Sequence, residues 1–202
     1  MKSKIKTKCS SIELPRGYIS WSQLTTWEGS PERYIKHYVY GEETFVNDEM
    51  RFGGYVAREL EKGKSDNLII DMLVSVVPKY AKSEHKLEVD LEEIKLFGIL
   101  DSFCPKTKNI IEYKTGKEPW TQNRADEHGQ LHFYALMVWL KYKKIPKIKL
   151  VWIQTIRGNG IEITGEVKEF EVEIKLIDIL KMANRIKKVA YEIAQAYKAE
   201  IN

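Results

Sequence analysis

The chain has 202 residues, of which 43% are hydrophobic and 31% charged, so it is long enough to bury a core and is not compositionally disordered. It carries 33 Lys and Arg against 29 Asp and Glu, and the formal charge of +4 permits a nucleic-acid partner without requiring one. Two cysteines exclude a framework of several disulfides, and the longest apolar run, residues 133–140, is too short to span a bilayer.

The N-terminal part of the chain is predicted to be helical. Residues 1–19 form a basic lead-in with no apolar stretch behind it, so we expect no secretory signal, no membrane partner and a cytoplasmic protein. Ser20 is the expected N-cap of the first helix, because Gln23 stands at the capping-box position three residues later. The further helices expected in this part cover residues 31–41, 52–62 and 67–79.

The spacing of apolar residues changes to that of strands in the middle of the chain. Residues 86–90 alternate between charged and apolar side chains, as a half-buried strand does. Two further strands are expected over residues 96–103 and 109–114, joined by a turn-rich segment. The remaining expected elements are a helix over 122–142, strands over 147–156 and 161–174 with a hairpin turn at 157–160, and a long amphipathic helix with apolar residues from Leu176 to Tyr197.

This order of elements predicts an α/β protein with a central mixed sheet flanked by helices. No internal repeat and no linker rich in Pro, Gly or Ser divides the chain, so we expect one domain over residues 1–202. Its expected parts are the lead-in over 1–19, a helical part over 20–80, a sheet core over 84–174 that contains the helix 122–142, and a C-terminal helix over 175–199.

Three charged residues on neighbouring strands are the candidates for chemistry. Asp101 lies on one expected strand, and Glu112 and Lys114 lie on the next, with ten residues between the two acids. Because side chains of a strand alternate, Glu112 and Lys114 share one face, and Asp101 comes alongside Glu112 if the two strands form a hairpin. Two carboxylates that converge at a sheet edge suit a hard cation, Mg²⁺ or Mn²⁺. Lys114 could then orient an attacking water or neutralise charge on a phosphate.

An ordinary structural role is the alternative for these residues, because cross-strand pairs of acids and bases are common on protein surfaces. Three neighbouring features favour chemistry. Glu112 lies in an apolar strand, where an unpaired charge is costly. Residues 115–117 turn the chain sharply away from that strand. Gln130 and Tyr134 of the following helix are four residues apart and therefore share one helical face.

Five short patterns occur together in an order that is typical of one enzyme family. They are ISWSQLTTWEGSPERYIKHYVYGE at residues 19–42, the helix from Phe52-Gly53 to Leu60-Glu61, Gly98-x-x-Asp101, Glu112-x-Lys114, and Gln130-x-x-x-Tyr134. With them, residues 20–140 resemble the PD-(D/E)xK nuclease superfamily in its RecB-like exonuclease branch. The resemblance implies a restriction-endonuclease-like core, here with extra N-terminal helices and a long C-terminal helix.

The resemblance also implies roles for the residues that match the family's pattern. These residues are Asp101, Glu112, Tyr113, Lys114, Gln130 and Tyr134. The two acids would bind the metal ion, with the backbone carbonyl of the first tyrosine as a further ligand. The lysine would be catalytic, and the glutamine and the second tyrosine would shape the site and contact the DNA backbone or the attacking water.

The chain departs from the family's pattern at two positions. Ala57 stands where the helix motif has a metal-binding histidine, which puts a second metal ion in doubt. Glu61 lies one turn further along the same helical face and could reach the metal, but a solvated residue near the helix end is an equal alternative. Ser30 stands where the opening motif has a cysteine, and because the iron–sulfur members use four cysteines, no iron–sulfur cluster is expected.

A second group of residues follows the candidate strand and is expected to contact DNA. Lys117, Trp120 and Arg124 combine positive charge with an aromatic face, which is typical of surfaces that bind single strands. His128 and His132 have the spacing of metal ligands on a helix, but they do not share the face of Gln130 and Tyr134. We therefore expect these two histidines to form a polar pair on the surface.

These patterns predict a Mg²⁺- or Mn²⁺-dependent deoxyribonuclease, an exonuclease rather than an endonuclease, that acts in DNA repair, recombination or the processing of mobile elements and defence. DNA is the expected partner, with a homo-oligomer or a recombination or defence complex as further assemblies. The alternative, suggested by Ala57, is a nuclease-fold protein of little or no activity that binds DNA or serves as an accessory subunit.

Overall fold

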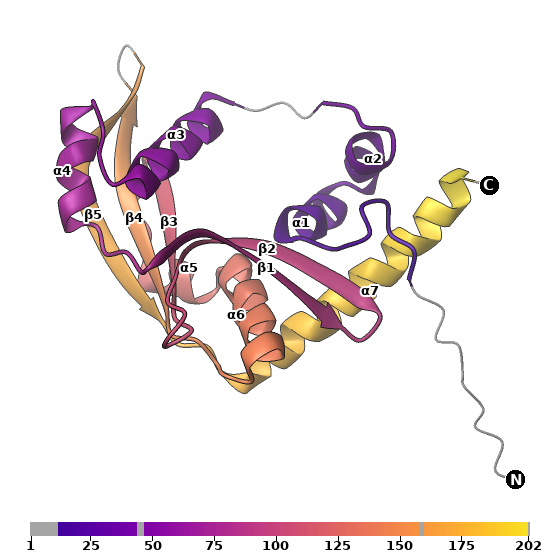
Figure 1. The fold of residues 1–202 in the computed structure, drawn as a ribbon. Helices are drawn as coiled ribbons and strands as arrows, with labels where there is room; N and C mark the ends of the chain where they lie inside the picture. The colour runs from indigo at the N-terminus through magenta and orange to yellow at the C-terminus, as the bar shows by residue number, and fades with distance from the viewer. Residues whose placement is uncertain (1–11, 44–46, 158–159, 202) are drawn as a thin grey trace, which may run out of the picture.

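Figure 1 shows the fold in a computed structural model, which describes residues 12–43, 47–157 and 160–201. Helices in the N-terminal part are α1 (Trp21–Gly29), α2 (Pro31–Tyr34) with the π-helical stretch Ile35–Val39, α3 (Asp48–Lys62) and α4 (Leu68–Val76). The strands are β1 (Lys82–Leu91), β2 (Ile94–Phe103), β3 (Ile110–Gly116), β4 (Ile148–Arg157) and β5 (Ile161–Val172). Helices α5 (Gln122–Asp126) and α6 (Gly129–Tyr142) connect β3 to β4, and α7 (Leu176–Ile201) ends the chain.

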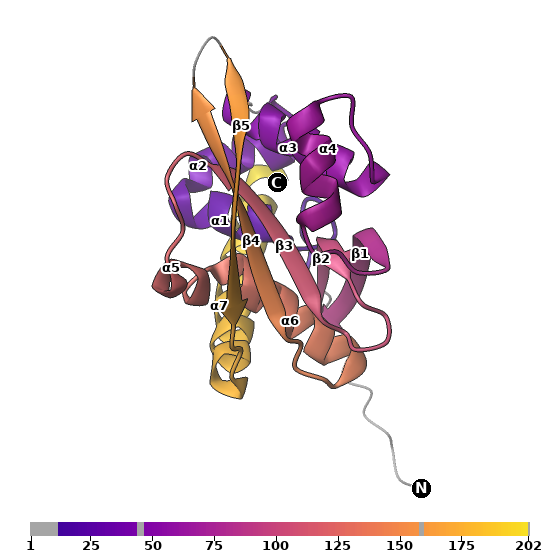
Figure 2. The same ribbon diagram turned by 90° about the vertical axis from the view of Figure 1, so that its left-hand side faces the viewer.

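The five strands form one mixed sheet in the order β1-β2-β3-β4-β5. The pairs β1–β2, β2–β3 and β4–β5 are antiparallel, and β3–β4 is parallel. The parallel pair requires a crossover, which α5 and α6 provide, as Figure 2 shows from the side of β4. The predicted mixed sheet flanked by helices, with N-terminal helices and a long C-terminal helix, is therefore confirmed.

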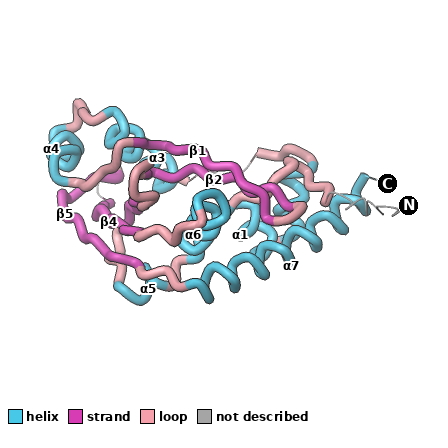
Figure 3. Tube along the Cα trace, turned by 60° about the horizontal axis from the view of Figure 1, so that its bottom comes forward, coloured by secondary structure: helices cyan, strands magenta, loops and turns pink. Residues whose placement is uncertain are grey.

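Each face of the sheet is covered by its own layer of helices (Figure 3). The larger core contains α6, α7 and α1, and the smaller core lies under α3 and α4. Neighbouring residues of β3 point into different cores, Ile110 into the larger one and Ile111 into the smaller one. This alternation sends the side chains of Glu112 and Lys114 toward α6, where Lys114 donates hydrogen bonds to both Glu112 and Gln130.

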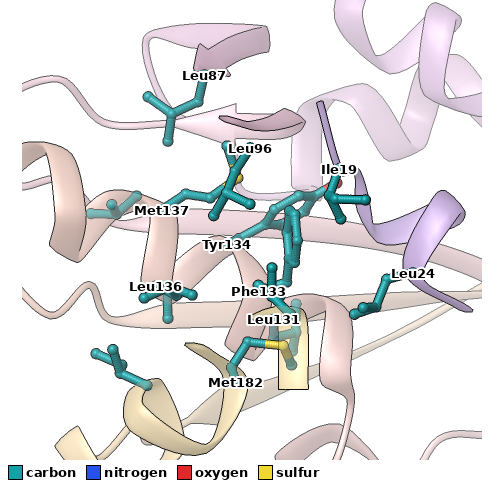
Figure 4. Close-up of a cluster of buried hydrophobic side chains, with 14 of the residues drawn as sticks. Ile19, Leu24, Leu87, Leu96, Leu131, Phe133, Tyr134, Leu136, Met137 and Met182 are labelled. Carbon is teal, nitrogen blue, oxygen red and sulfur yellow. The ribbon is translucent and has the colours of Figure 1, made fainter. Parts of the chain in front are cut away.

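Helix α6 is buried on almost every side, because the sheet covers one flank and α7 the other (Figures 3 and 4). Leu131, Phe133, Leu136 and Met137 have no exposed surface. Burial of such a side chain stabilises the fold by about 1.5–3 kcal/mol, so α6 is held firmly against β2 and β3. Gly98 of β2 allows the close approach, since a Cβ atom there would lie 3.0 Å from both Tyr134 and Met137.

The helix predicted over residues 122–142 is in fact two helices, and the prediction of a continuous element was wrong. Glu127 ends α5, and His128 is the extended N-cap residue of α6. The Trp21 ring of α1 packs against the first residue of α6, since a Cβ atom on Gly129 would come within 2.4 Å of it. A contact between segments so far apart in sequence has no signature in the local spacing of apolar residues.

Other element boundaries differ by a few residues. Helix α3 begins at Asp48 because the Asn47 side chain accepts a hydrogen bond from the Met50 amide. Helix α4 ends at Val76, since the following residue precedes Pro78 and is extended. Strand β1 begins at Lys82 rather than at residue 86. The predicted turn at 157–160 includes residues 158–159, which lie outside the described residues, as do residues 1–11 of the lead-in.

None of the helices in the described ranges combines the length and the apolar character that crossing a membrane would need.

Candidate active site

The candidate site lies where strands β2 and β3 separate. The two strands pair at Phe103↔Ile110 and Ser102↔Ile111, as the predicted hairpin requires. The next pair in this register is Asp101 and Glu112, and there the Asp101 carboxylate accepts the Tyr113 amide hydrogen bond over 2.8 Å. The Asp101 side chain thus takes the place of a backbone carbonyl as the acceptor for the next strand. The separation brings two carboxyl groups to the same point of the sheet.

Glu112 is buried to 1% exposure and is only partly paired. Its Oε1 atom accepts a hydrogen bond from Lys114 Nζ over 2.7 Å. Its Oε2 atom is also buried and has no hydrogen-bond partner among the described residues. The neighbouring Asp101 carboxyl cannot satisfy this oxygen while both groups are ionised, because neither then carries a proton to donate.

Lys114 connects the acids to helix α6. Its Nζ atom lies 2.7 Å from Glu112 Oε1 and 2.7 Å from Gln130 Oε1. The Gln130 amide nitrogen in turn donates to the Tyr134 hydroxyl over 2.9 Å. The shared helical face predicted for Gln130 and Tyr134 is therefore confirmed, and it fixes the lysine from a second direction. About a quarter of the Lys114 side chain remains exposed, so its amine can also meet a substrate.

Burial and like charge both work against ionisation of the two acids. Desolvation, followed by the charge of Glu112, raises the pKa of Asp101 to about 8, although the Tyr113 amide and Lys114 oppose the rise. Desolvation also raises the pKa of Glu112, against the opposing effect of Lys114. Such a pair is stabilised in its ionised form when a cation binds between the two groups.

The donor set fits a hard divalent cation. The two carboxyl groups and the unpaired Glu112 oxygen supply anionic oxygens, which Mg²⁺ and Mn²⁺ prefer. Among the described residues, no three His, Cys, Asp or Glu side chains are arranged to hold an ion by themselves. A Mg²⁺ ion does not need three, because it commonly takes one or two carboxylates and completes its shell with water and substrate phosphate.

The two departures from the family's pattern have structural counterparts. Ala57 and Glu61 of α3 line one small cavity together with Asp101, so they do share a face toward the acids. Glu61 is exposed, and its place in the cavity lining is compatible with either predicted role, a metal ligand or a solvated residue. Ser30, at the position of the family's cysteine, accepts a hydrogen bond from the Arg33 amide and so caps α2.

The segment predicted to contact DNA lies beside the site. Lys117 and Arg124 are exposed, and the Arg124 guanidinium stacks 4.2 Å from the centre of the Trp120 ring. A groove of about 290 Å³ extends along Thr115 and Lys117. A second groove of about 460 Å³ shares Glu49 and Thr115 with it and is also lined by Lys114 and Ala57. Lys117 and Lys114 therefore line neighbouring grooves along α3.

The expectation that His128 lies on the surface was wrong. Its ring packs against Trp120 and Trp21, at 5.0 and 6.3 Å between ring centres, and its Nε2 atom is buried. Burial, with the charge of Lys114, lowers the pKa of His128 to about 4. At neutral pH the ring is therefore uncharged, and it lies beside Gln130. The helix spacing of His128 did not reveal this, because the residue precedes α6 instead of lying within it.

The raised pKa of Asp101 predicts how stability depends on pH when metal is removed. Between the ordinary pKa of 3.8 and about 8, the folded chain keeps a proton that the unfolded chain has released. The free energy of unfolding should therefore fall as pH rises, by up to about 1.4 kcal/mol per pH unit. His128 acts in the opposite direction between pH 4 and 6.5, so pH 6.5–8 is the clear window.

Urea unfolding in the presence of EDTA at pH 6.5, 7.2 and 8 measures this slope. The Asp101→Asn variant should have a flatter profile. A wild-type stability that stays constant or increases over this window would contradict the assigned burial of the charge.

Residues 53–201 match the sequence profile of the PD-(D/E)XK nuclease superfamily. No curated protein sequence matches the chain. Among solved structures, a protein from Eubacterium rectale that is presumed to be an exonuclease superposes with a TM-score of 0.65 at 11% identity, covering 98% of this chain and 88% of its own.

Two further solved structures share the fold. The phage-related exonuclease from Haemophilus somnus 129PT superposes with a TM-score of 0.57 at 14% identity, covering 88% of this chain and 84% of its own. The alkaline exonuclease LHK-Exo from Laribacter hongkongensis gives 0.51 at 10% identity, with 92% and 94% coverage. Identities this low establish the common fold alone.

Proposed function

Because this chain belongs to the PD-(D/E)XK nuclease superfamily, we propose that it is a metal-dependent deoxyribonuclease of the exonuclease type, which hydrolyses phosphodiester bonds of DNA. The observation that carries the proposal is the pair of the partly buried Asp101 and the fully buried Glu112, beside a lysine that α6 holds in place. A purely structural sheet edge gains nothing from two neighbouring carboxyl groups that are withdrawn from water and repel each other.

Asp101 and Glu112 are the proposed ligands of Mg²⁺ or Mn²⁺, with the Tyr113 carbonyl as a further ligand. A divalent cation in this place would supply a Lewis acid that offsets charge on the phosphate and favours deprotonation of the attacking water. The chain itself fixes the acids before substrate arrives. The Tyr113 amide orients Asp101, and the Tyr113 hydroxyl donates to the Pro78 carbonyl over 2.7 Å, which anchors this strand to the segment after α4.

Lys114 is the proposed catalytic lysine. Its ammonium donates toward Glu112 and Gln130 and has an exposed side, from which it can donate to the attacking water or to a phosphate oxygen. Gln130 positions the lysine, and Tyr134 positions Gln130. Tyr134 is 6% exposed and packs closely against Gly98. Its role in the free protein is therefore to hold Gln130, and through it Lys114, in position.

The groove along α3 is the proposed path of the DNA strand, with Lys117 in its lining, and Trp120 and Arg124 of the segment after β3 are the further proposed contacts. Replacing Lys117 or Arg124 with alanine should weaken DNA binding for all sequences alike, because contacts to phosphate carry no sequence information. Each substitution should also reduce the slope of log K against log salt by about 1. Fluorescence anisotropy with a labelled oligonucleotide at several KCl concentrations measures both effects.

Lys141→Ala is the matched control for this prediction, because Lys141 is also exposed but lies at the opposite end of α6 from Gln130. Equal losses of affinity in Lys141→Ala and Lys117→Ala would argue against the proposed path.

A nuclease-fold protein that binds DNA without cutting it is the second candidate, and Ala57 in place of the family's histidine favours it. The two candidates differ in one assay, in which linear and circular DNA, single- and double-stranded and end-labelled, are incubated with Mg²⁺, Mn²⁺ or EDTA. The proposed exonuclease degrades linear DNA only with metal and leaves closed circles intact. Binding without degradation in either metal would identify the second candidate, and cleavage of circles would identify an endonuclease.

A further inference from the structure

A small cavity lies beside Asp101 on the side that Ala57 leaves open. Its acidic lining comes from three elements, Glu61 of α3, Glu84 of β1 and Asp101 of β2. Lys79 also lines it and is the cation of this lining. The room inside is about 10 Å³, which is close to the smallest space that holds one water molecule or ion. Three carboxyl groups around so small a space need more positive charge than one lysine provides.

Glu84 holds a special position in this lining. The register of β1 and β2 passes from Ser83↔Ser102 to His85↔Leu100, so Glu84 is the residue opposite Asp101. The φ angle of Glu84 is +46°, in the left-handed region that glutamate rarely adopts. A non-glycine residue in this conformation inside a strand is costly and is commonly found at functional sites.

The charges around Glu84 are those of the candidate site itself. Desolvation raises the pKa of Glu84, followed by the charges of Asp101 and Glu61. Glu84 in turn contributes to the raised pKa of Glu112. The Glu112 Oε2 atom is buried and without a hydrogen-bond partner among the described residues, which indicates a ligand beside Glu112, within reach of the charge of Glu84.

We propose that Glu84 is the third carboxylate of the cation site. It is supplied by β1 on the side where Ala57 has no side-chain atom that could bind a metal ion. The inference rests on the proposed metal-dependent function. It assigns to Glu84 the contribution for which Glu61 was the sequence-based candidate. Glu84 lies in the strand next to Asp101, between the pairs Ser83↔Ser102 and His85↔Leu100, whereas Glu61 comes from helix α3.

Binding requires the Glu84 side chain to turn inward, since no three such side chains in the described ranges already converge on one point. This rotation is inexpensive, because the Glu84 side chain is exposed and therefore not held by core packing. The folded chain already holds Glu84 in its unfavourable backbone conformation, so the rotation involves side-chain torsions alone.

The test is Mn²⁺ binding to the full chain without DNA, followed by electron paramagnetic resonance of the unbound ion. Glu84→Gln should weaken Mn²⁺ binding by at least about tenfold, as expected for loss of an anionic ligand. Glu88→Gln is the matched control, since Glu88 is exposed on the same face of β1 but lies opposite Phe97. It should change the affinity by less than about twofold.

Glu84→Gly separates ligand loss from damage to the fold. Glycine adopts the positive φ without strain, so this variant should melt in EDTA at no lower temperature than the wild type and still lose Mn²⁺ affinity. Unchanged affinity in Glu84→Gln, or a loss in Glu61→Gln instead, would overturn the inference and leave the proposed nuclease intact. Absence of Mn²⁺ binding in the wild type would overturn both.

Discussion

Replacing Lys114 with alanine is expected to lower the rate of DNA hydrolysis by about 10²–10³-fold, the usual cost of removing one donor that stabilises developing charge. Lys114 lies between the buried Glu112 carboxylate and Gln130, 2.7 Å from an oxygen of each. The methyl group of alanine cannot donate the hydrogen bonds that this amine donates, so the substitution should slow the chemical step. Single-turnover rates with saturating Mg²⁺ and end-labelled linear DNA measure the effect separately from substrate binding.

Lys149→Ala is the control for this prediction. Lys149 also forms a strand lysine–glutamate pair, 2.5 Å from Glu169, but both partners are partly exposed on β4 and β5. Its loss should leave the rate within about twofold, because surface ion pairs contribute little. Mn²⁺ affinity should survive Lys114→Ala, since the proposed ligands are unchanged. A Lys114→Ala protein that cleaves DNA at the wild-type rate would contradict the catalytic role.

Replacing Asp101 with asparagine is expected to abolish cleavage, by at least about 10³-fold, and to stabilise the metal-free fold at the same time. Asparagine retains an oxygen that can accept the Tyr113 amide hydrogen bond, which measures 2.8 Å in the wild type. It removes the charge that burial and Glu112 disfavour, the same effects that raise the pKa of Asp101 to about 8. The gain should be about 1–3 kcal/mol at pH 8 in EDTA.

Urea unfolding in EDTA and cleavage in Mg²⁺ measure the two halves of this prediction on one protein. Asp90→Asn provides the control, because Asp90 is exposed on β1 and opposite Lys95. It should change neither property appreciably. An Asp101→Asn protein that is less stable than the wild type in EDTA would argue that the buried charge is compensated within the chain and does not require a cation.

Features that depend on one strand or one helix could be predicted from the sequence. The alternation along β3 gave the shared face of Glu112 and Lys114, and helical spacing gave that of Gln130 and Tyr134. The hairpin of β2 and β3 was also predicted. The separation of these strands at Asp101, which brings the acids together, was not, because it depends on one side chain replacing a backbone hydrogen bond.

Features that depend on contacts between distant segments were missed. The strand predicted over residues 86–90 excluded Glu84, because His85 and Glu84 break the alternation that identified it. Only the register with β2 places Glu84 opposite Asp101. At the break before α6, the Trp21 ring of α1, more than 100 residues earlier, packs against Gly129 and the half-buried His128, contacts that local spacing could not predict.

The claim that Asp101 and Glu112 bind a divalent cation is tested most directly by an anomalous difference map from crystals soaked in Mn²⁺. The account predicts a peak in contact with both carboxylates and near the Tyr113 carbonyl, and its disappearance in Asp101→Asn crystals. A fully soaked crystal with no peak between the two acids, or with manganese bound elsewhere in the chain, would contradict it.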